Sequence, residues 1–305
     1  MTSRYAEFRK SESNWGRWGA DDQLGTVNLI DAENRREAAS LVRHGRLVSM
    51  ARRIPNQPAP NNPFPAQHFV ERHAYPALPG GAEYACDYVG LASHVVECTH
   101  IDALCHIWDN DVMWNGRSPD TAIAFDGGGV RWGGVHNFKG GIVTRGVLLD
   151  VAASRPDGHV SQDRPVTAEE LLAVAAAQST EVRPGDAVVI HCGRDVWQRA
   201  EADRRYGSTP GYRPGLHASC LEPLRTWDCS VLVWDMLDAL PAEDAGGWTV
   251  HGAIPSFGLA LIDNAYLEPL AAACAEIGTY EFMLCIAPLW IEGGTNSPVN
   301  PLALL

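Results

Sequence analysis

The chain has 305 residues, of which 46% are hydrophobic and 20% charged, a composition typical of a globular protein with a large core rather than of a disordered chain. The formal net charge of -13 repels phosphate backbones and anionic membranes, so we expect neither nucleic acid nor membrane as a partner. The opening residues carry no apolar stretch of the kind found in signal peptides, and no run of about 18 apolar residues occurs. We therefore expect a cytoplasmic protein.

No low-complexity linker interrupts the sequence. A length prior of about 150 residues per domain would allow two domains, but α/β enzymes of this size often form one unit. We therefore expect residues 1–305 to form a single compact domain. The eight cysteines include no C-x-x-C pair, which argues against a zinc ribbon and favours buried free thiols.

In chain order, the first predicted elements are a helix over residues 32–43, capped by Asp31, and a strand over residues 46–51. Residues 52–82 follow, and they are dense in Pro, Asn and Gly. This density predicts a long irregular loop, which could be either a substrate flap or a surface excursion.

The second half of the sequence alternates between helix and strand patterns. Thr167 and Glu170 form a capping box at the start of an Ala-rich helix. The elements expected after it are the strand AVVIHCG, a helix near LHASCLEPLRTW, the strand SVLVWD, a helix near IPSFGLALIDNAYLEPLAAACAE and the strand FMLCIAPLW. This alternation predicts an α/β fold with at least one central sheet. His191 and Asp235 end two of these strands, where each could line a pocket or serve packing.

The stretch ECTHIDALCHIWDND places three polar side chains, each costly to remove from water, among apolar residues. They are His100, Asp102 and His106. A buried imidazole or carboxylate must be paired, hydrogen-bonded or bound to a metal. Residues two apart in a strand share a face, so His100 and Asp102 could meet one ion. Their nitrogen and oxygen donors suit zinc, manganese or iron, and a carboxylate can bridge two ions. His106 could be a further ligand or an acid/base beside the metal.

The segment THIDALCH resembles the core of the H-x-G-T-H-x-D-x-P-x-H signature of the metal-dependent cyclase-like hydrolases, which include bacterial kynurenine formamidases and isatin hydrolases. The segments WGRWGADDQLGTVNLI, MWNG and APLWIEGGTNSPVNPLAL are also similar to landmarks of the longer members. The resemblance implies a swivelling β/β/α cyclase-like fold. It also implies a homodimer or homotetramer with the site near a subunit boundary.

The resemblance implies a set of metal ligands and an acid/base. It places His100 and Asp102 at two ligand positions and His106 at the acid/base position, while His251 and Asp263 resemble the distal ligand pair. Asp263 stands where the family usually has Glu.

The signature's first histidine is replaced here by Val96. His94 could take its place if the chain bulges, and Cys98 lies on the right face to offer a thiolate. The implied cofactor is a divalent metal, zinc or manganese, as one or two ions.

The expected function is metal-dependent hydrolysis of an amide, lactam, lactone or ester bond in a small, aromatic or cyclic molecule. Trp15, Trp108 and Trp114 lie close to the resembling segments and could line the substrate pocket or simply pack in the core. A natural-product cyclase or dehydratase of the same family is the nearest alternative. A catalytically inactive small-molecule binding protein is another, because Val96 removes an expected ligand.

Overall fold

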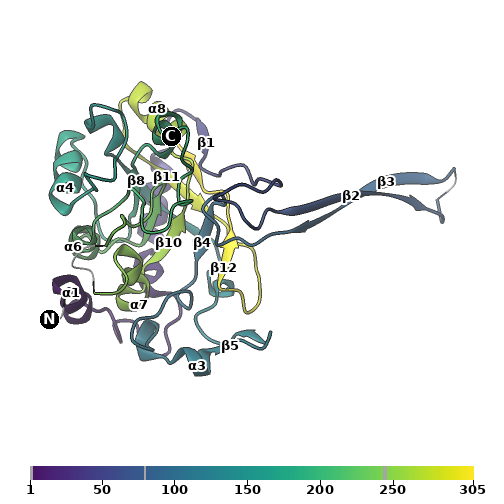
Figure 1. Ribbon diagram of the computed structural model, residues 1–305, viewed down its shortest axis with the longest axis horizontal. Helices are drawn as coiled ribbons and strands as arrows, with labels where there is room; N and C mark the ends of the chain where they lie inside the picture. The colour runs from purple at the N-terminus through teal and green to yellow at the C-terminus, as the bar shows by residue number, and fades with distance from the viewer. Residues whose placement is uncertain (1–2, 79, 243–245) are drawn as a thin grey trace.

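A mixed nine-stranded sheet forms the centre of the computed structural model, which describes residues 3–78, 80–242 and 246–305 (Figure 1). Its strand order is β1-β13-β11-β7-β8-β9-β10-β4-β12. The strands of this sheet are β1 (Leu47–Ser49), β4 (His100–Asp102), β7 (Ile142–Asp150), β8 (Ala187–His191), β9 (Val231–Trp234), β10 (Ala260–Asp263), β11 (Glu281–Ile286), β12 (Asn296–Pro298) and β13 (Leu302–Leu304). The neighbouring pairs from β7 to β10 are parallel, and the remaining pairs are antiparallel.

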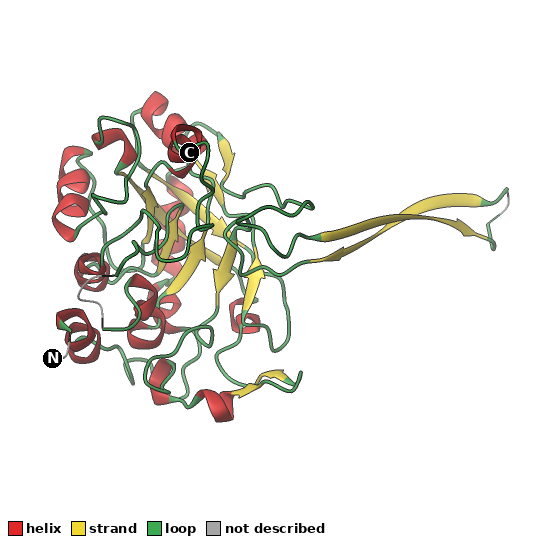
Figure 2. Ribbon diagram, viewed as in Figure 1, coloured by secondary structure: helices red, strands yellow, loops and turns green. Residues whose placement is uncertain are grey.

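Helices surround this sheet (Figure 2). Those in the described residues are α1 (Arg4–Ser11), α2 (Ala32–Ser40), α3 (Pro119–Ala122), α4 (Ala168–Ala177), α5 (Arg194–Ala200), α6 (Leu221–Thr226), α7 (Ala253–Phe257) and α8 (Glu268–Ile277). Asp31 caps α2 as predicted and forms a capping box with Asn34. At α4 only half of the predicted capping box is present: the Thr167 hydroxyl accepts from the backbone of Glu170, whose carboxylate instead accepts from Arg155. No helix among the residues placed by the structure is long and apolar enough to cross a bilayer.

The central strands are buried because their sequences are continuously apolar. Strand β8 (AVVIH) and strand β9 (VLVW) are buried at every position, as parallel strands covered on both faces must be. They belong to a large hydrophobic cluster that extends from the sheet to the flanking helices. Strand β10 is equally buried and lies between β9 and β4.

Strand β10 corrects one prediction. The segment predicted as a single helix around residues 254–276 forms α7, then β10, then α8. Gly258 takes a left-handed conformation (φ 69°) that ends α7, and its backbone carbonyl accepts from Thr26. The three apolar residues of ALID are too short a run to distinguish strand from helix by periodicity, which is why the sequence pattern misled.

A second correction concerns residues 52–82, which were predicted to be irregular. Strands β2 (Gln67–Tyr75) and β3 (Ala82–Gly90) instead form an antiparallel ribbon that projects from the body (Figure 1). The aromatic and β-branched residues of QHFVERHAY and AEYACDYVG favour strands. The two strands were not predicted because the many Pro and Asn residues of positions 52–66, just before them, indicated an irregular segment.

Candidate metal centre

Strand β4 carries the site, and its pairing determines which side chains meet. His100 and Asp102 are two residues apart and share a face. On β10, Asp263 stands directly opposite His100, and on β12, Asn296 stands directly opposite Asp102. Because directly opposed residues in antiparallel strands project to the same side, the sheet gathers all four polar side chains on one face.

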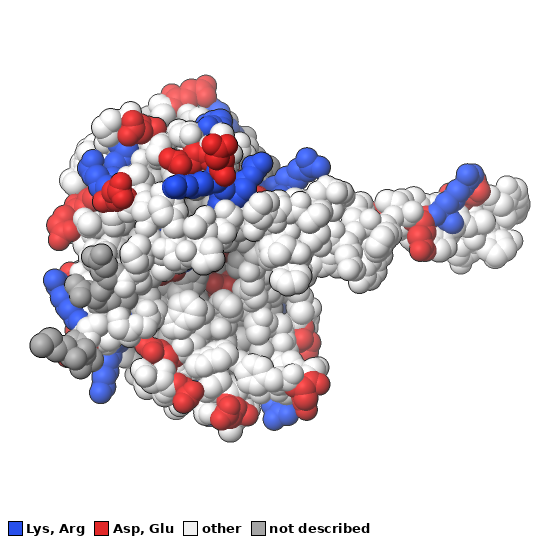
Figure 3. Space-filling view, in the orientation of Figure 1, with Lys and Arg blue, Asp and Glu red and all other residues white. Residues whose placement is uncertain are grey.

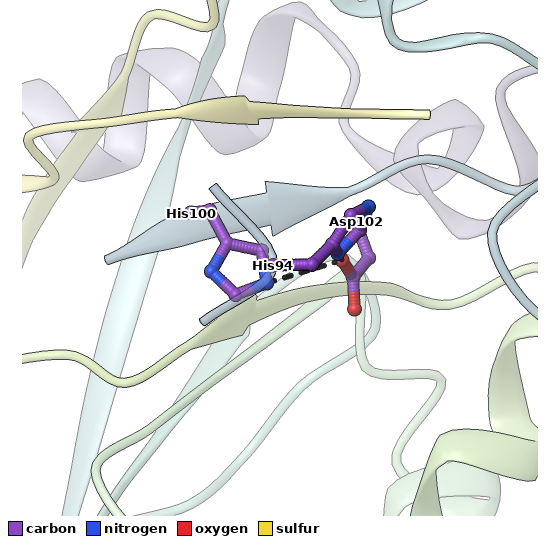
Figure 4. Close-up of side chains that lie close together, drawn as sticks. All are labelled: His94, His100 and Asp102. Carbon is purple, nitrogen blue, oxygen red and sulfur yellow. Dashed lines mark ion pairs between the residues drawn. The ribbon is translucent and has the colours of Figure 1, made fainter. Parts of the chain in front are cut away.

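Asp102 lies at the centre of a group of imidazoles. Its Oδ1 atom is 3.2 Å from Nδ1 of His94, 3.4 Å from Nε2 of His100 and 3.9 Å from Nε2 of His106 (Figure 4 shows the first two histidines). Its side chain is 0% exposed. Within the described chain, neither carboxylate oxygen accepts a hydrogen bond of good geometry. A buried carboxylate in this condition requires a cation beside it.

A second donor group shares the same carboxylate. His251, in the 3₁₀ helix η6 (Val250–Gly252), places Nε2 at 3.1 Å from Oδ2 of Asp263 and 4.0 Å from Oδ2 of Asp102. The donor atoms of His94, His100 and Asp102 all lie within 4.8 Å of one another, and so do those of Asp102, His251 and Asp263. Asp102 therefore belongs to two potential metal-binding groups.

Two of the imidazoles are oriented by their other ring nitrogen. Nδ1 of His100 lies 2.9 Å from the carbonyl oxygen of Cys98, which only accepts hydrogen bonds, so this nitrogen carries the proton. Nδ1 of His251 is likewise hydrogen-bonded to the carboxylate of Asp238. In the neutral form of each ring, the Nε2 lone pair therefore points at carboxylate oxygens, an arrangement typical of histidine metal ligands.

The electrostatics of the centre favour positive charge. Burial lowers the pKa of His100, but the Asp102 carboxylate, whose Oδ1 is 3.4 Å from Nε2, outweighs burial and raises the pKa to about 9. The pKa of His251 is raised well above its usual value, because Asp238 and Asp263 overcome the effect of burial. Two rings that would be neutral in water are thus driven to carry a proton, the charge that a metal ion could supply instead.

His106 behaves differently from the other histidines. Burial lowers its pKa to about 4, more than Asp102 raises it. Its ring stacks on that of His94, with centroids 3.8 Å apart and planes at 13°. The side chain is only partly buried. His106 is therefore a neutral imidazole at pH 7, in contact with the acidic centre and with an exposed edge.

Comparison with known proteins identifies the family. The family model described as "Putative cyclase" matches residues 31–239, more than half of the chain. The chain belongs to the cyclase family. The resemblance inferred from the sequence is thereby confirmed, although a comparison with curated proteins gives no match.

Solved structures share the fold of this cyclase-family chain. A structure described as a novel cyclase is 28% identical, covers 96% of this chain and 97% of its own, and has a TM-score of 0.84. Isatin hydrolase A from Labrenzia aggregata is 18% identical, with 85% and 93% coverage and a TM-score of 0.54. Isatin hydrolase A from Ralstonia solanacearum is 17% identical, with 90% and 97% coverage and a TM-score of 0.53. The predicted α/β cyclase-like fold is confirmed.

His94 stands two residues before Val96, the residue that replaces the signature's first histidine, and its ring lies beside Asp102. The chain bends at His94 and turns over residues 95–98, where the backbone nitrogen of Cys98 donates to the carbonyl of Val95. Val96 packs against Gly207 and the core, and its carbonyl accepts from Arg194. The Cys98 thiol lies 3.6 Å from the carbonyl of Thr99, and burial raises its pKa to about 11. Cys98 belongs to neither donor group.

The three tryptophans predicted to contact substrate lie in different surroundings. Trp114 is fully buried and its indole donates to the carbonyl of Asp22, which favours the alternative that it packs in the core. Trp15 lines a hollow of about 640 Å³ that none of the predicted ligands borders. The backbone carbonyl of Trp108 accepts from the indole of Trp248, whose ring lies 6.0 Å from that of His251.

Sequence reasoning missed four residues that support the centre. Asp238 orients His251, and the Trp234 indole donates to Asp263 at 2.6 Å. Trp248, 44% exposed, lies beside His251, and its position three residues before that histidine was the available signal. Asn296 has a buried amide nitrogen with no hydrogen-bond partner among the described residues, and its place in the GGTNSP segment was a signal as well.

His191 and Asp235, which end strands, have structural partners. Nδ1 of His191 lies 2.8 Å from Asp150 at the end of the neighbouring strand. The Asp235 carboxylate accepts from three backbone nitrogens at the start of α5, those of residues 192–194. These hydrogen bonds account for the burial of both polar side chains, so their burial needs no pocket role to explain it.

Proposed function

We propose that this cyclase-family protein is a metal-dependent hydrolase of an amide, lactam, lactone or ester bond in a small aromatic or cyclic molecule. The observation that carries the proposal is the Asp102 carboxylate, which is buried without good hydrogen bonds and shared by two groups of potential ligands. We expect His94, His100 and Asp102 to hold one divalent ion, zinc or manganese. Asp102, His251 and Asp263 would hold a second ion if two bind.

The residues present fit such an ion. Two imidazole nitrogens present lone pairs because their opposite nitrogens are hydrogen-bonded, and two carboxylates supply oxygen donors. Nitrogen and oxygen donors of this kind suit zinc and manganese. A divalent ion bound here would lower the pKa of a bound water toward about 7 and polarise a substrate carbonyl.

The chain's own groups account for proton transfer and orientation. His106 is neutral at pH 7 and partly exposed, so it can accept a proton and pass it to the leaving nitrogen or oxygen of the substrate. The Asn296 amide nitrogen, buried opposite Asp102, can donate to a substrate carbonyl oxygen. The exposed face of Trp248 can pack against an aromatic substrate.

A cyclase or dehydratase is the second candidate. It is favoured by the solved structure described as a cyclase, which is 28% identical over 96% of this chain. The inactive binding protein has less support, because His94 supplies a nitrogen donor beside Asp102 although Val96 is not a ligand. Both catalytic candidates use the same centre and differ in substrate.

Hydrolysis assays before and after chelation test the proposal. The purified protein would be assayed on isatin, N-formyl aromatic amides and lactones. We expect it to hydrolyse at least one of these classes, to lose the activity after chelation, and to regain it when zinc or manganese is added back. Hydrolysis that survives complete removal of the metal would contradict the proposal. Ring closure of the open-chain products without hydrolysis would favour the cyclase.

Asp238→Asn tests how His251 is oriented. The substitution leaves the side-chain volume unchanged but removes the negative charge and replaces one of the two acceptor oxygens with an NH2 group, so Nδ1 of His251 is held less firmly. Loss of such an orienting carboxylate typically weakens metal binding by about 10- to 100-fold. We expect that loss in a direct metal titration, with Asp157→Asn, at an exposed carboxylate on the surface, as the matched control. Equal metal affinity in both variants would show that Asp238 does not position the ligand.

A further inference from the structure

Arg194, the first residue of α5, is a charged side chain that lies inside the protein. On the face drawn in Figure 3, the charged side chains lie mostly toward the edges of the molecule. The Arg194 side chain, by contrast, is only 3% exposed. A buried guanidinium is costly unless hydrogen-bond acceptors surround it, so its partners show what the buried charge does.

Two of its hydrogen bonds hold the segment that carries His94. The Nη2 atom of Arg194 donates to the carbonyl of Val96 at 2.7 Å and to the Glu97 carboxylate at 2.8 Å. Residues 94–98 form a bend and a turn between β3 and β4, and such connecting segments are more mobile than the elements they join. The guanidinium therefore fixes the backbone two residues after His94.

A further hydrogen bond reaches the segment that carries Asp263. The Nη1 atom of Arg194 donates to Oδ1 of Asn264 at 2.9 Å. Asn264 follows Asp263 at the end of β10 and has a left-handed backbone (φ 58°), which is uncommon for a residue other than glycine. Its backbone carbonyl accepts from the hydroxyl of Thr99, the residue before His100. Arg194 thus joins the supports of ligands that lie far apart in the sequence.

The ring of Tyr206 extends these contacts toward His251. The guanidinium lies 4.4 Å from the centre of this ring, within the range of a cation–π interaction. The Tyr206 hydroxyl accepts from the backbone nitrogen of Leu237 at 2.6 Å. Leu237 precedes Asp238, the carboxylate that orients His251. Through its hydrogen bonds and this ring, the guanidinium is connected to segments that support ligands of both donor groups.

The guanidinium is itself held in place and remains charged. The backbone nitrogen of Arg194 donates to the Asp235 carboxylate at 3.0 Å. Burial and the nearby charge of Arg52 lower the pKa of Arg194 to about 10, which still leaves the side chain charged at pH 7. A planar guanidinium with fixed donor directions can bind several acceptors at once, which the flexible ammonium group of lysine does less well.

We propose that Arg194 is a positioning residue of the metal centre, which holds His94 and Asp263 in the arrangement that binds a divalent ion. The inference rests on the proposed function, because it assumes that these two side chains are metal ligands. Without the guanidinium, the backbone beside each ligand loses a hydrogen bond and becomes more mobile. The ion must then order both segments as it binds, which weakens its affinity.

A direct metal titration of the full chain tests this role at Arg194 and at a matched control, Arg155. The Arg155 side chain is also 3% exposed, and it donates to a backbone carbonyl and to the Glu170 carboxylate. The residues that it contacts belong to neither donor group of the described chain. Each arginine would be replaced by Met, which removes the charge, and by Lys, which keeps it.

We expect all four variants to lower the melting temperature of the metal-free protein, because each leaves buried acceptors without their donors. Only the Arg194 variants should weaken zinc or manganese binding, by about 10- to 100-fold, as is typical when a group that supports a metal ligand is lost. On electrostatic grounds alone, removing a positive charge near the centre would strengthen cation binding. Weaker binding in Arg194→Met therefore reports lost positioning, and Arg194→Lys tests the same role with the charge retained.

Hydrogen exchange of the metal-free protein gives a second readout. The backbone amides of residues 95–98 should exchange faster in Arg194→Lys than in the wild type, and at the wild-type rate in Arg155→Lys. Metal affinities in the folded Arg194 variants that equal those of the Arg155 variants would overturn this inference and leave the proposed function intact. A wild type that binds no metal would instead contradict the proposed function, and this inference with it.

Discussion

The Asp102→Asn variant should bind less than about one tenth of the divalent metal that the wild type binds, and its turnover should fall by at least about 100-fold. The substitution keeps the volume of the side chain but removes the negative charge that both donor groups share. One of the two carboxylate oxygens becomes an NH2 group, which donates hydrogen bonds and has no lone pair available for a metal ion. Metal analysis and turnover measured on the same preparation check both results.

Stability provides a readout that does not depend on activity. Metal that binds only the folded state raises the melting temperature by mass action, so chelation should lower the melting temperature of the wild type. Chelation should leave the melting temperature of the Asp102→Asn variant unchanged. Asp157→Asn, at an exposed carboxylate, should behave as the wild type does in every assay. If Asp102→Asn retained a full complement of metal, the carboxylate would not be a ligand.

The His106→Ala variant should lose about 100-fold or more in turnover while keeping its metal. His106 belongs to neither donor group, and its low pKa makes it a neutral proton acceptor at pH 7. His94, which stacks on it, belongs to a donor group. His94→Ala is therefore the matched comparison, and it should lose both metal and activity.

The pair of variants separates two roles within one stack of rings. If His106→Ala lost as much metal as His94→Ala, His106 would be a metal ligand or would hold a ligand in place. Unchanged turnover in His106→Ala would remove it from the mechanism. Only the combination of retained metal and lost turnover is consistent with an acid/base.

The part of the site that the sequence predicted follows from local geometry. His100 and Asp102 share a face because residues two apart in a strand do so, whatever the rest of the fold. The distal residues His251 and Asp263 came from the family resemblance, and the structure places their side chains 3.1 Å apart. The strands β8, β9 and β11 were predicted from apolar runs that fit no other element so well.

The rest of the site depends on tertiary contacts that leave no local pattern. Asp238 and Trp234 reach their partners only because the sheet and η6 bring them together. His94 lies beside Asp102, next to a turn whose sequence, VVEC, carries no Gly or Pro signal. Strand β10 was hidden within a predicted helix, since a run of three apolar residues before Asp263 fits either structure.

Anomalous diffraction from crystals grown with manganese or zinc would locate the metal. We expect a strong peak bounded by Asp102 and the ring nitrogens of His94 and His100, with a second peak toward His251 and Asp263 if two ions bind. A metal content below about 0.2 equivalents after supplementation, or a peak elsewhere with none beside Asp102, would contradict the proposed metal centre.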